Sequence, residues 1–255
     1  MVDDSIRLAV LEDIAEISKA GTQVVLVHGG GPFINNILTR LNIQSEFIDG
    51  HRKTSAEAIK YIEMALTGEV NASLVRVLNT LEIKAVGLSG KDAGIVVARK
   101  RYHFREEERI DLGWVGDVDS VDPSLINDLL STGYVPVLTC LAPDTNGNVY
   151  NINADMFAGH IAAALHADEY IVLTDVDGLL RDKDDPTTLI SSLTYGESKK
   201  LMGDIIVGGM IPKIESCGIS LENGAKKARI INGTKKGLLP DLFINGKKIG
   251  TSITN

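Results

Sequence analysis

Residues 24–38 read Val-Val-Leu-Val-His-Gly-Gly-Gly-Pro-Phe-Ile-Asn-Asn-Ile-Leu, and this stretch decides the fold. The apolar run at its start is typical of a buried strand, and Ile34, Ile37 and Leu38 recur at helical spacing. The three glycines between strand and helix allow backbone N–H groups to approach an anion at the start of the helix. A tight turn alone needs one glycine, so three favour anion binding.

Strand-then-helix units recur on both sides of this stretch. Further strands are expected at 85–88, 134–138, 170–174 and 228–231, with a hairpin at 95–118 and helices between. Thr54 and Glu57 fit a capping box for a helix that runs to about Leu66. Repeated units of this kind imply a mostly parallel sheet covered on both faces, with the ligand at the carboxyl ends of its strands. We find no internal repeat or linker and expect one domain, 1–255, with two lobes.

Composition narrows the class of partner and the compartment. The formal net charge is −8, from 34 acidic and 26 basic residues, which argues against nucleic-acid and anionic-membrane partners. Cys140 and Cys217 form no ligand-like cluster and are expected to be reduced, buried thiols. No apolar run is long enough to span a bilayer, and the acidic start lacks the features of a signal peptide. We therefore expect a cytoplasmic enzyme.

Four polar groups follow the glycine loop and are candidates for a site. Arg52 directly precedes the expected helix at Thr54, and its planar guanidinium suits a carboxylate, although a lone arginine is more often solvated. Asn151, Asn153 and Asp155 alternate before a helix. Capping explains one such residue, whereas an extended Asn-x-Asn-x-Asp would aim three polar groups at one site.

Two further segments lie in the C-terminal third. Asp175-Val176-Asp177-Gly178 follows an apolar strand, and could be a turn or could place carboxylates near Mg²⁺ and nucleotide. Lys213 follows Gly208-Gly209 in the first turns of a helix, where cations are disfavoured. A lysine there is either solvated or present for an anion.

Two common nucleotide signatures fit poorly. Gly87-Leu88-Ser89-Gly90-Lys91-Asp92 has neither the spacing nor the hydroxyl of a Walker A loop, and the triple glycine is not a G-x-G-x-x-G fingerprint. Asp49 does lie near the distance expected of a ribose-binding acid, so a nicotinamide-dependent dehydrogenase stays open.

Taken in order, six motifs resemble the amino acid kinase family. They are residues 28–32, 50–54, 87–92, 151–155, 174–178 and 208–213. The resemblance extends over the whole chain and implies an α/β fold, a three-layer αβα sandwich with an open, mainly parallel sheet. It implies that a lobe of about 1–168 binds N-acetyl-L-glutamate and forms a homodimer, and that 169–255 binds MgATP. The implied reaction phosphorylates the acceptor's side-chain carboxylate, in arginine biosynthesis.

The resemblance also implies roles for individual residues. The backbone of Gly30 and Gly31 would hold the acceptor and the phosphoryl group in flight, Arg52 and Asn151 would fix the acceptor's carboxylate, and Asn153 belongs to the same substrate-binding set. Asp155 would orient the catalytic lysines, and Lys213 would neutralise charge on the ATP phosphates. The nucleotide would lie along Asp175, Val176, Asp177, Gly178, Leu179, Leu180, Ile205, Ile206, Val207, Gly208 and Gly209. No metal ligand is assigned to the protein, and Mg²⁺ is expected with ATP.

The chain departs from the family at its beginning. The family starts with a strand and a Lys-x-Gly-Gly loop, and Met1 aligns just after that loop. We expect either a start codon assigned too late or a truncated protein with impaired catalysis. If the short chain is fully active, another lysine must replace the lysine of that loop, and Lys91 is the first candidate. Two alternatives to an acetylglutamate-phosphorylating enzyme stay open. One is a kinase of the same fold that acts on carrier-bound aminoadipate, and the other, suggested by the missing loop, is a non-catalytic binding or sensor protein.

Overall fold

A computed structural model describes residues 3–48, 51–106, 108–182 and 184–255. The chain packs into two compact units. The central unit comprises residues 25–79 and 84–157, and the C-terminal unit comprises the described part of the first 24 residues with 80–83 and 158–255. The boundary thus falls near residue 158 and the C-terminal unit is discontinuous, whereas the sequence suggested contiguous lobes that meet near residue 168.

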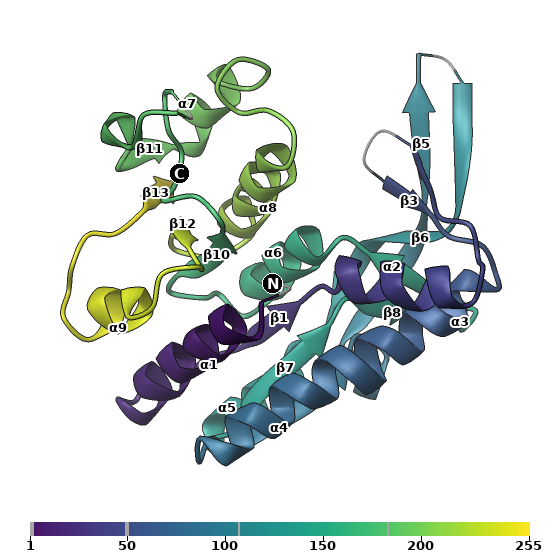
Figure 1. Ribbon diagram of the computed structural model, residues 1–255, viewed down its shortest axis with the longest axis horizontal. Coiled ribbons are helices and arrows are strands. Elements are labelled where there is room, and N and C mark those ends of the chain that lie inside the picture. The colour runs from purple at the N-terminus through teal and green to yellow at the C-terminus, as the bar shows by residue number, and fades with distance from the viewer. Residues whose placement is uncertain (1–2, 49–50, 107, 183) are drawn as a thin grey trace. The chain divides into compact units, whose positions relative to one another are not determined.

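The central unit is built on a parallel three-stranded sheet (Figure 1). Its strand order is β1 (Leu26–His28), β7 (Val135–Thr139), β4 (Ala85–Ser89). The carboxyl ends of these strands are in register, because His28 and Ser89 both pair with Thr139. The helices of this unit are α2 (Gly31–Arg40), α3 (Ala58–Glu63), η1 (Met64–Asn71), α4 (Ala72–Thr80), the short η2 (Asp92–Gly94) and α5 (Ser124–Ser131).

A second sheet and a small hairpin complete the central unit. The sheet has the order β5 (Val96–Arg105), β6 (Glu108–Val121), β9 (Val149–Ile152), β8 (Leu141–Pro143), and the hairpin joins β2 (Glu46–Ile48) to β3 (His51–Lys53). The long β5–β6 pair confirms the expected hairpin, and it projects from the unit in Figure 1.

The prediction of a capping box formed by Thr54 and Glu57 is wrong. Thr54 is fully buried, and its backbone bonds to Leu112 and Trp114 of β6 at 2.9 and 2.7 Å. Glu57 lies before α3 without a side-chain cap, and Ser55 Oγ accepts from Ala58 N at 3.1 Å instead. The helix also does not stop near Leu66, because α3 continues through the π-helical segment η1 into α4. Pairing with a distant strand therefore overrides the local capping pattern.

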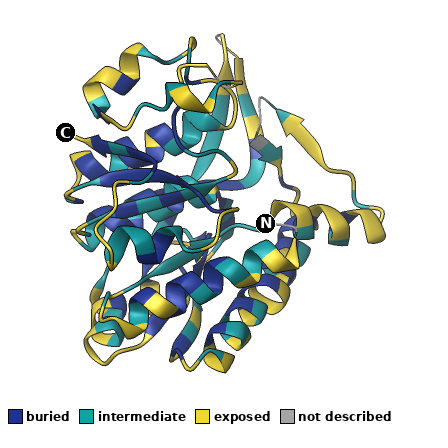
Figure 2. Cartoon of the chain, turned by 60° about the vertical axis from the view of Figure 1, so that its left-hand side comes forward, coloured by how far each residue is buried: buried dark blue, intermediate teal, exposed yellow. Residues whose placement is uncertain are grey.

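The C-terminal unit has a mixed four-stranded sheet in the order β10 (Tyr170–Thr174), β12 (Ala228–Asn232), β13 (Thr251–Thr254), β11 (Ser192–Thr194). The β10–β12 and β11–β13 pairs are parallel, and β12–β13 is antiparallel. Its helices are α1 (Asp4–Lys19), most of α6 (Ala154–Ala164), η3 (Pro186–Thr188), α7 (Tyr195–Lys200), α8 (Met210–Glu222) and α9 (Leu238–Phe243). Buried residues concentrate in the strands and on the inner faces of the helices (Figure 2).

The first helix and the last helix of the C-terminal unit are joined by polar contacts. Asp13 is buried in α1, and its carboxylate accepts hydrogen bonds from Gly237 N, at 2.8 Å, and Leu239 N, at 3.4 Å. It therefore caps the N-terminus of α9 from a distant helix. Lys236 adds an ion pair to Glu12 at 2.6 Å.

Candidate active site

A cavity of about 230 Å³ lies in the central unit, at the point where the glycine loop leaves β1. Gly29, Gly30 and Gly31 form one wall, and Arg52 reaches it from the β2–β3 hairpin. The segment 151–154 and the β5–β6 hairpin supply the other polar groups, and apolar side chains such as Ile34 and Leu66 fill the space between. The structure thus brings together the substrate-binding residues that the sequence predicted for this unit.

The glycine loop is packed closely at Gly30, where an added side chain would force a neighbour to move. A Cβ on Gly30 would lie 2.5 Å from Cδ2 of Leu66, which is fully buried. The loop leads directly into α2, with Pro32 at its start and no acidic residue in its first turn. The first N–H groups of a helix have no intrahelical acceptor and favour an anion. The backbone of this wall therefore offers the kind of N–H donors that suit an anion.

Arg52 is held at the cavity by its neighbours. Its guanidinium donates to Ser45 Oγ and to Asn35 Oδ1, and lies 4.5 Å from the centre of the Phe47 ring. Partial burial lowers the pKa of the Arg52 guanidinium, but arginine remains charged at physiological pH. The cavity thus contains a pre-positioned cation with a planar, two-pronged donor face.

Asn151, Asn153 and Asp155 do not form one extended face. Asn151 lies in β9 and lines the cavity, as does Asn153. Asn153 Oδ1 accepts from Met156 N at 3.1 Å, so this residue caps α6, as the simpler interpretation held. Asp155 lies in the first turn of α6 and is not among the cavity-lining residues. The alternation ends at Asn153 because the chain turns into a helix there.

The cavity wall also contains an ion pair that the sequence did not reveal. Arg101 Nη1 and Asp117 Oδ1 are 2.7 Å apart, and both residues line the cavity. The β5–β6 register jumps from Lys100–Gly116 to Tyr102–Asp111, so Arg101 lies at an irregularity in the ladder. Such bulges redirect a side chain, and strand alternation alone cannot anticipate them.

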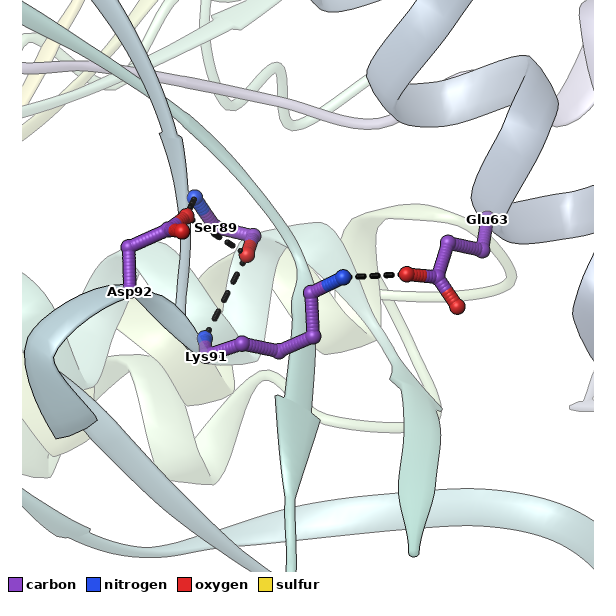
Figure 3. Close-up of polar contacts among 4 residues, drawn as sticks. All are labelled: Glu63, Ser89, Lys91 and Asp92. Carbon is purple, nitrogen blue, oxygen red and sulfur yellow. Dashed lines mark hydrogen bonds and ion pairs between the residues drawn. The ribbon is translucent and has the colours of Figure 1, made fainter. Parts of the chain in front are cut away.

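The turn at Gly87–Asp92 has a structural explanation (Figure 3). Asp92 Oδ2 accepts from Ser89 N at 2.6 Å and from Ser89 Oγ at 2.9 Å. Lys91 pairs with Glu63 of α3 and is not a cavity-lining residue. These bonds fix the turn after β4. Asp49, on which the nicotinamide interpretation depended, lies outside the described residues.

The C-terminal unit holds the residues predicted to contact nucleotide. Asp175 is exposed in the loop after β10, whereas Asp177 accepts from Asn232 Nδ2 at 2.7 Å and pairs with Lys235. These two bonds, that to Lys235 first, lower the pKa of the Asp177 carboxyl. Leu179 and Ile206 are buried in the core of the unit. Their side chains therefore support the loop, and a ligand could meet only their backbone.

The rest of this predicted set lies around two loops. Val176 and Leu180 are half-buried beside Gly178, and Ile205 is half-buried beside Val207, which is exposed. Gly208 and Gly209 are exposed and lead directly into α8. Lys213 lies in the first turn of α8, and its carbonyl accepts from Ser216 Oγ at 2.8 Å. The lysine thus lies at a helix start, as predicted.

Within residues 3–48, 51–106, 108–182 and 184–255, no three His, Cys, Asp or Glu side chains are grouped as metal ligands. No helix in these same ranges has the length and apolar character needed to cross a membrane.

Comparison with known proteins identifies the family. The sequence model of the amino acid kinase family matches residues 2–232. The chain belongs to the amino acid kinase family. Relatives of this amino acid kinase include curated acetylglutamate kinases. That of Moorella thermoacetica is 44% identical over 238 residues, or 91% of this chain and 80% of the relative. The chloroplastic enzyme of Arabidopsis thaliana is 42% identical over 255 residues, or 100% of this chain and 72% of the relative.

Solved structures agree with the fold of this amino acid kinase. A Streptococcus mutans protein superposes with a TM-score of 0.78 at 28% identity, covering 96% of this chain and 91% of that one. N-acetylglutamate synthase from Neisseria gonorrhoeae has a TM-score of 0.84 at 23% identity, covering 99% of this chain and 57% of that one. The second likeness concerns the fold alone. The expected αβα sandwich with mainly parallel sheets is confirmed.

Proposed function

We propose that this chain transfers the γ-phosphoryl group of ATP to the side-chain carboxylate of N-acetyl-L-glutamate, a step of arginine biosynthesis. A carboxylate oxygen attacks the γ-phosphorus, the bond to the β,γ-bridging oxygen breaks, and ADP leaves. The product is N-acetylglutamyl 5-phosphate. The observation that carries the proposal is the cavity between the glycine loop, Arg52 and Asn151, in a chain whose curated relatives are acetylglutamate kinases.

The cavity matches the chemistry of this acceptor. N-acetylglutamate carries two carboxylates and an apolar acetyl methyl group. Arg52 and Asn151 offer donors for the carboxylate that does not react, and the backbone of Gly30 and Gly31 offers N–H groups to the reacting one. Phe47 and Met156 provide apolar surface in the same cavity for the methyl group. Asn153 contributes its amide while it caps α6.

ATP is assigned to the C-terminal unit. The loops at 175–180 and 205–209 would follow the nucleotide, with Lys213 on its phosphates. Asp155 would orient the lysine side chains. Mg²⁺ would arrive bound to the phosphates, since it is commonly held by substrate phosphates and one or two carboxylates. In these loops the exposed carboxylate of Asp175 would contact the Mg²⁺ ion, because the Asp177 carboxylate is bonded to Asn232 and Lys235.

In-line phosphoryl transfer needs alignment and charge stabilisation and no covalent enzyme intermediate. The backbone donors and Lys213 supply the charge stabilisation in this scheme. We further propose that the enzyme works in the cytoplasm as a homodimer. Light scattering on the purified chain measures its mass in solution, and a monomer at micromolar concentration would contradict the dimer.

The activity is tested with purified protein, MgATP and acetylglutamate. An acyl phosphate reacts with hydroxylamine, so the expected result is ATP-dependent formation of a hydroxamate. N-acetylglutamine is the matched control, because it replaces the side-chain carboxylate by an amide of nearly the same shape. Equal ADP formation with both compounds would show that the carboxylate is not the acceptor. Saturable binding of NADH in the absence of ATP binding would favour a dehydrogenase instead.

A further inference from the structure

His28 and Asn71 meet beneath the glycine loop. His28 is the last residue of β1, and Asn71, which is buried, is the last residue of the π-helical segment η1. Asn71 Nδ2 lies 3.0 Å from His28 Nε2 and donates to Val137 O at 2.9 Å. His28 Nδ1 lies 2.8 Å from Gly29 O. Four groups thus form one continuous chain of hydrogen bonds.

The two carbonyl groups at the ends of this hydrogen-bonded series determine which ring nitrogen of His28 carries the proton. Val137 and Gly29 both present carbonyl oxygens, which can only accept. The Asn71 amide nitrogen must therefore face Val137, and its second hydrogen points at His28 Nε2. Nε2 then has to accept, so the proton is on Nδ1, which donates to Gly29. A doubly protonated imidazolium would place two donors against each other at Asn71. The neutral Nδ1–H tautomer is the one form that satisfies every bond.

The hydrogen bond between His28 Nδ1 and Gly29 O holds the peptide group that joins Gly29 to Gly30, and both glycines line the cavity. Gly29 O belongs to the same planar, trans peptide as Gly30 N–H, and the two groups point in opposite directions. Holding the oxygen of Gly29 therefore fixes the direction of the Gly30 N–H. Gly29 and Gly30 have no side chain that could fix this peptide, and glycine backbone is otherwise free to rotate.

Packing keeps Asn71 in place. A Cβ on Gly87 would lie 2.1 Å from Asn71 Oδ1, so β4 approaches the amide closely. Leu66 and Val70 of the same η1 segment pack against Gly30. The π-helical segment thus contacts the loop at Gly30 and supports it at His28. Such segments are frequent at functional sites.

We propose that His28 is a positioning residue, held by Asn71 as the neutral Nδ1–H tautomer, which orients the Gly30 N–H toward the anion that the cavity binds. The proposal rests on the proposed function, because it assigns that N–H to the acceptor carboxylate or the transferring phosphoryl group. His28 itself touches neither. Its effect passes through the Gly29–Gly30 peptide.

The tautomer is measured first, by nitrogen-15 NMR of the histidine rings in the unliganded full chain. The His28 signals are identified as those missing from His28→Asn. We expect a protonated Nδ1 and an unprotonated Nε2. The Gly30 amide signal should shift in His28→Leu and in Asn71→Leu. It should return toward its original position in His28→Asn, because the asparagine amide nitrogen occupies nearly the place of Nδ1. An Nε2–H tautomer, or an unmoved Gly30 signal in His28→Leu, overturns the proposal.

Kinetics per folded molecule then separate positioning from mere support of the fold. His28→Leu should lower kcat roughly 10- to 100-fold, less than the roughly 100- to 1,000-fold loss typical when a transition-state donor is removed outright. The KM for ATP should change little, and His28→Asn should recover most of the rate. If His28→Leu fails to fold, Asn71→Leu carries the same comparison, because it frees the tautomer. An unchanged kcat in the folded variant overturns the positioning role.

Failure of the proposed function gives a different result. A wild-type chain with the Nδ1–H tautomer and no phosphorylation of acetylglutamate contradicts the proposed reaction and leaves the tautomer assignment standing. The orienting effect is then decided by the Gly30 signal alone, which must move in His28→Leu and recover in His28→Asn.

Discussion

Arg101 Nη1 lies 2.7 Å from Asp117 Oδ1, and the two side chains occupy the cavity wall together. Arg101 comes from β5 and Asp117 from β6, so the β5–β6 hairpin contributes directly to the cavity that Arg52 enters from another hairpin. The wall therefore carries two cations and one carboxylate. The excess of positive charge suits an acceptor with two carboxylates.

Arg101→Gln should raise the KM for acetylglutamate several-fold and leave the KM for ATP unchanged. The change removes a cation from the cavity and leaves Asp117 without its ion pair. Arg99→Gln is the matched control, since Arg99 is on the same strand, is exposed and pairs with Asp119. Steady-state kinetics with each substrate varied in turn measure both constants. Equal effects of the two substitutions would assign Arg101 to general surface charge.

Arg52→Lys should raise the KM for acetylglutamate on the order of 10-fold. Lysine keeps the charge but loses the planar fork and the stacking on Phe47. Lys53→Arg serves as the control, because Lys53 is exposed and pairs with Glu46 at 3.1 Å. An effect of Arg52→Lys that appears only in the KM for ATP would remove Arg52 from the acceptor site.

Lys213→Ala should lower kcat roughly 100- to 1,000-fold, the usual cost of one preorganised electrostatic donor. Acetylglutamate binding, measured by calorimetry, should weaken much less. Lys199→Ala is the control within the same unit, where Lys199 is exposed and pairs with Glu222 at 3.1 Å. Near-normal turnover of the Lys213 variant would place this lysine outside the chemistry.

The stability of the protein should fall at alkaline pH through Cys140. The pKa of Cys140 is raised from about 9 to about 12, chiefly by burial and to a smaller extent by the Asp155 carboxylate. The folded state therefore keeps a proton that the unfolded chain loses above pH 9. This contribution to the unfolding free energy is fully present below pH 9 and is lost toward pH 12, by at most about 1.4 kcal/mol per pH unit.

Urea unfolding of the wild type and of Cys140→Ala measures this effect. The cavity left by the substitution lowers stability by an amount that does not depend on pH. The difference in unfolding free energy between the wild type and Cys140→Ala should therefore be constant from pH 7 to 8.5 and should become smaller as the pH rises to 10.5. A difference that stays constant over the whole range contradicts the raised pKa.

The elements that the sequence predicted correctly are those with a local signal. The β5–β6 hairpin has strands joined by a short connection. The glycine loop is recognisable because three consecutive glycines follow an apolar run, and Leu66 packs directly against one of them, Gly30. In each case the residues that decide the structure are close together in the sequence, or have no side chain.

Prediction from the sequence failed where the structure of a residue depends on a partner that is distant in the sequence. Threonine is a common helix cap, but the backbone of Thr54 forms a β-bridge with Gly113 of β6 instead. Arg101 reads as part of an exposed charged run, and only the ladder irregularity turns it toward Asp117. His28 reads as an ordinary buried histidine until Asn71, 43 residues further on, defines its tautomer. None of these partners can be found from local spacing.

The contact between Asp13 and the start of α9 spans 224 residues of sequence. During synthesis α1 therefore leaves the ribosome well before its partner Gly237 is made. Residues 25–157, which include all the residues that line the cavity, are complete long before then. Contacts of such separation form slowly, because a long loop must close first. Helix α1 can therefore dock on α9 only late in synthesis, and until then its apolar face is exposed to chaperones and to other nascent chains.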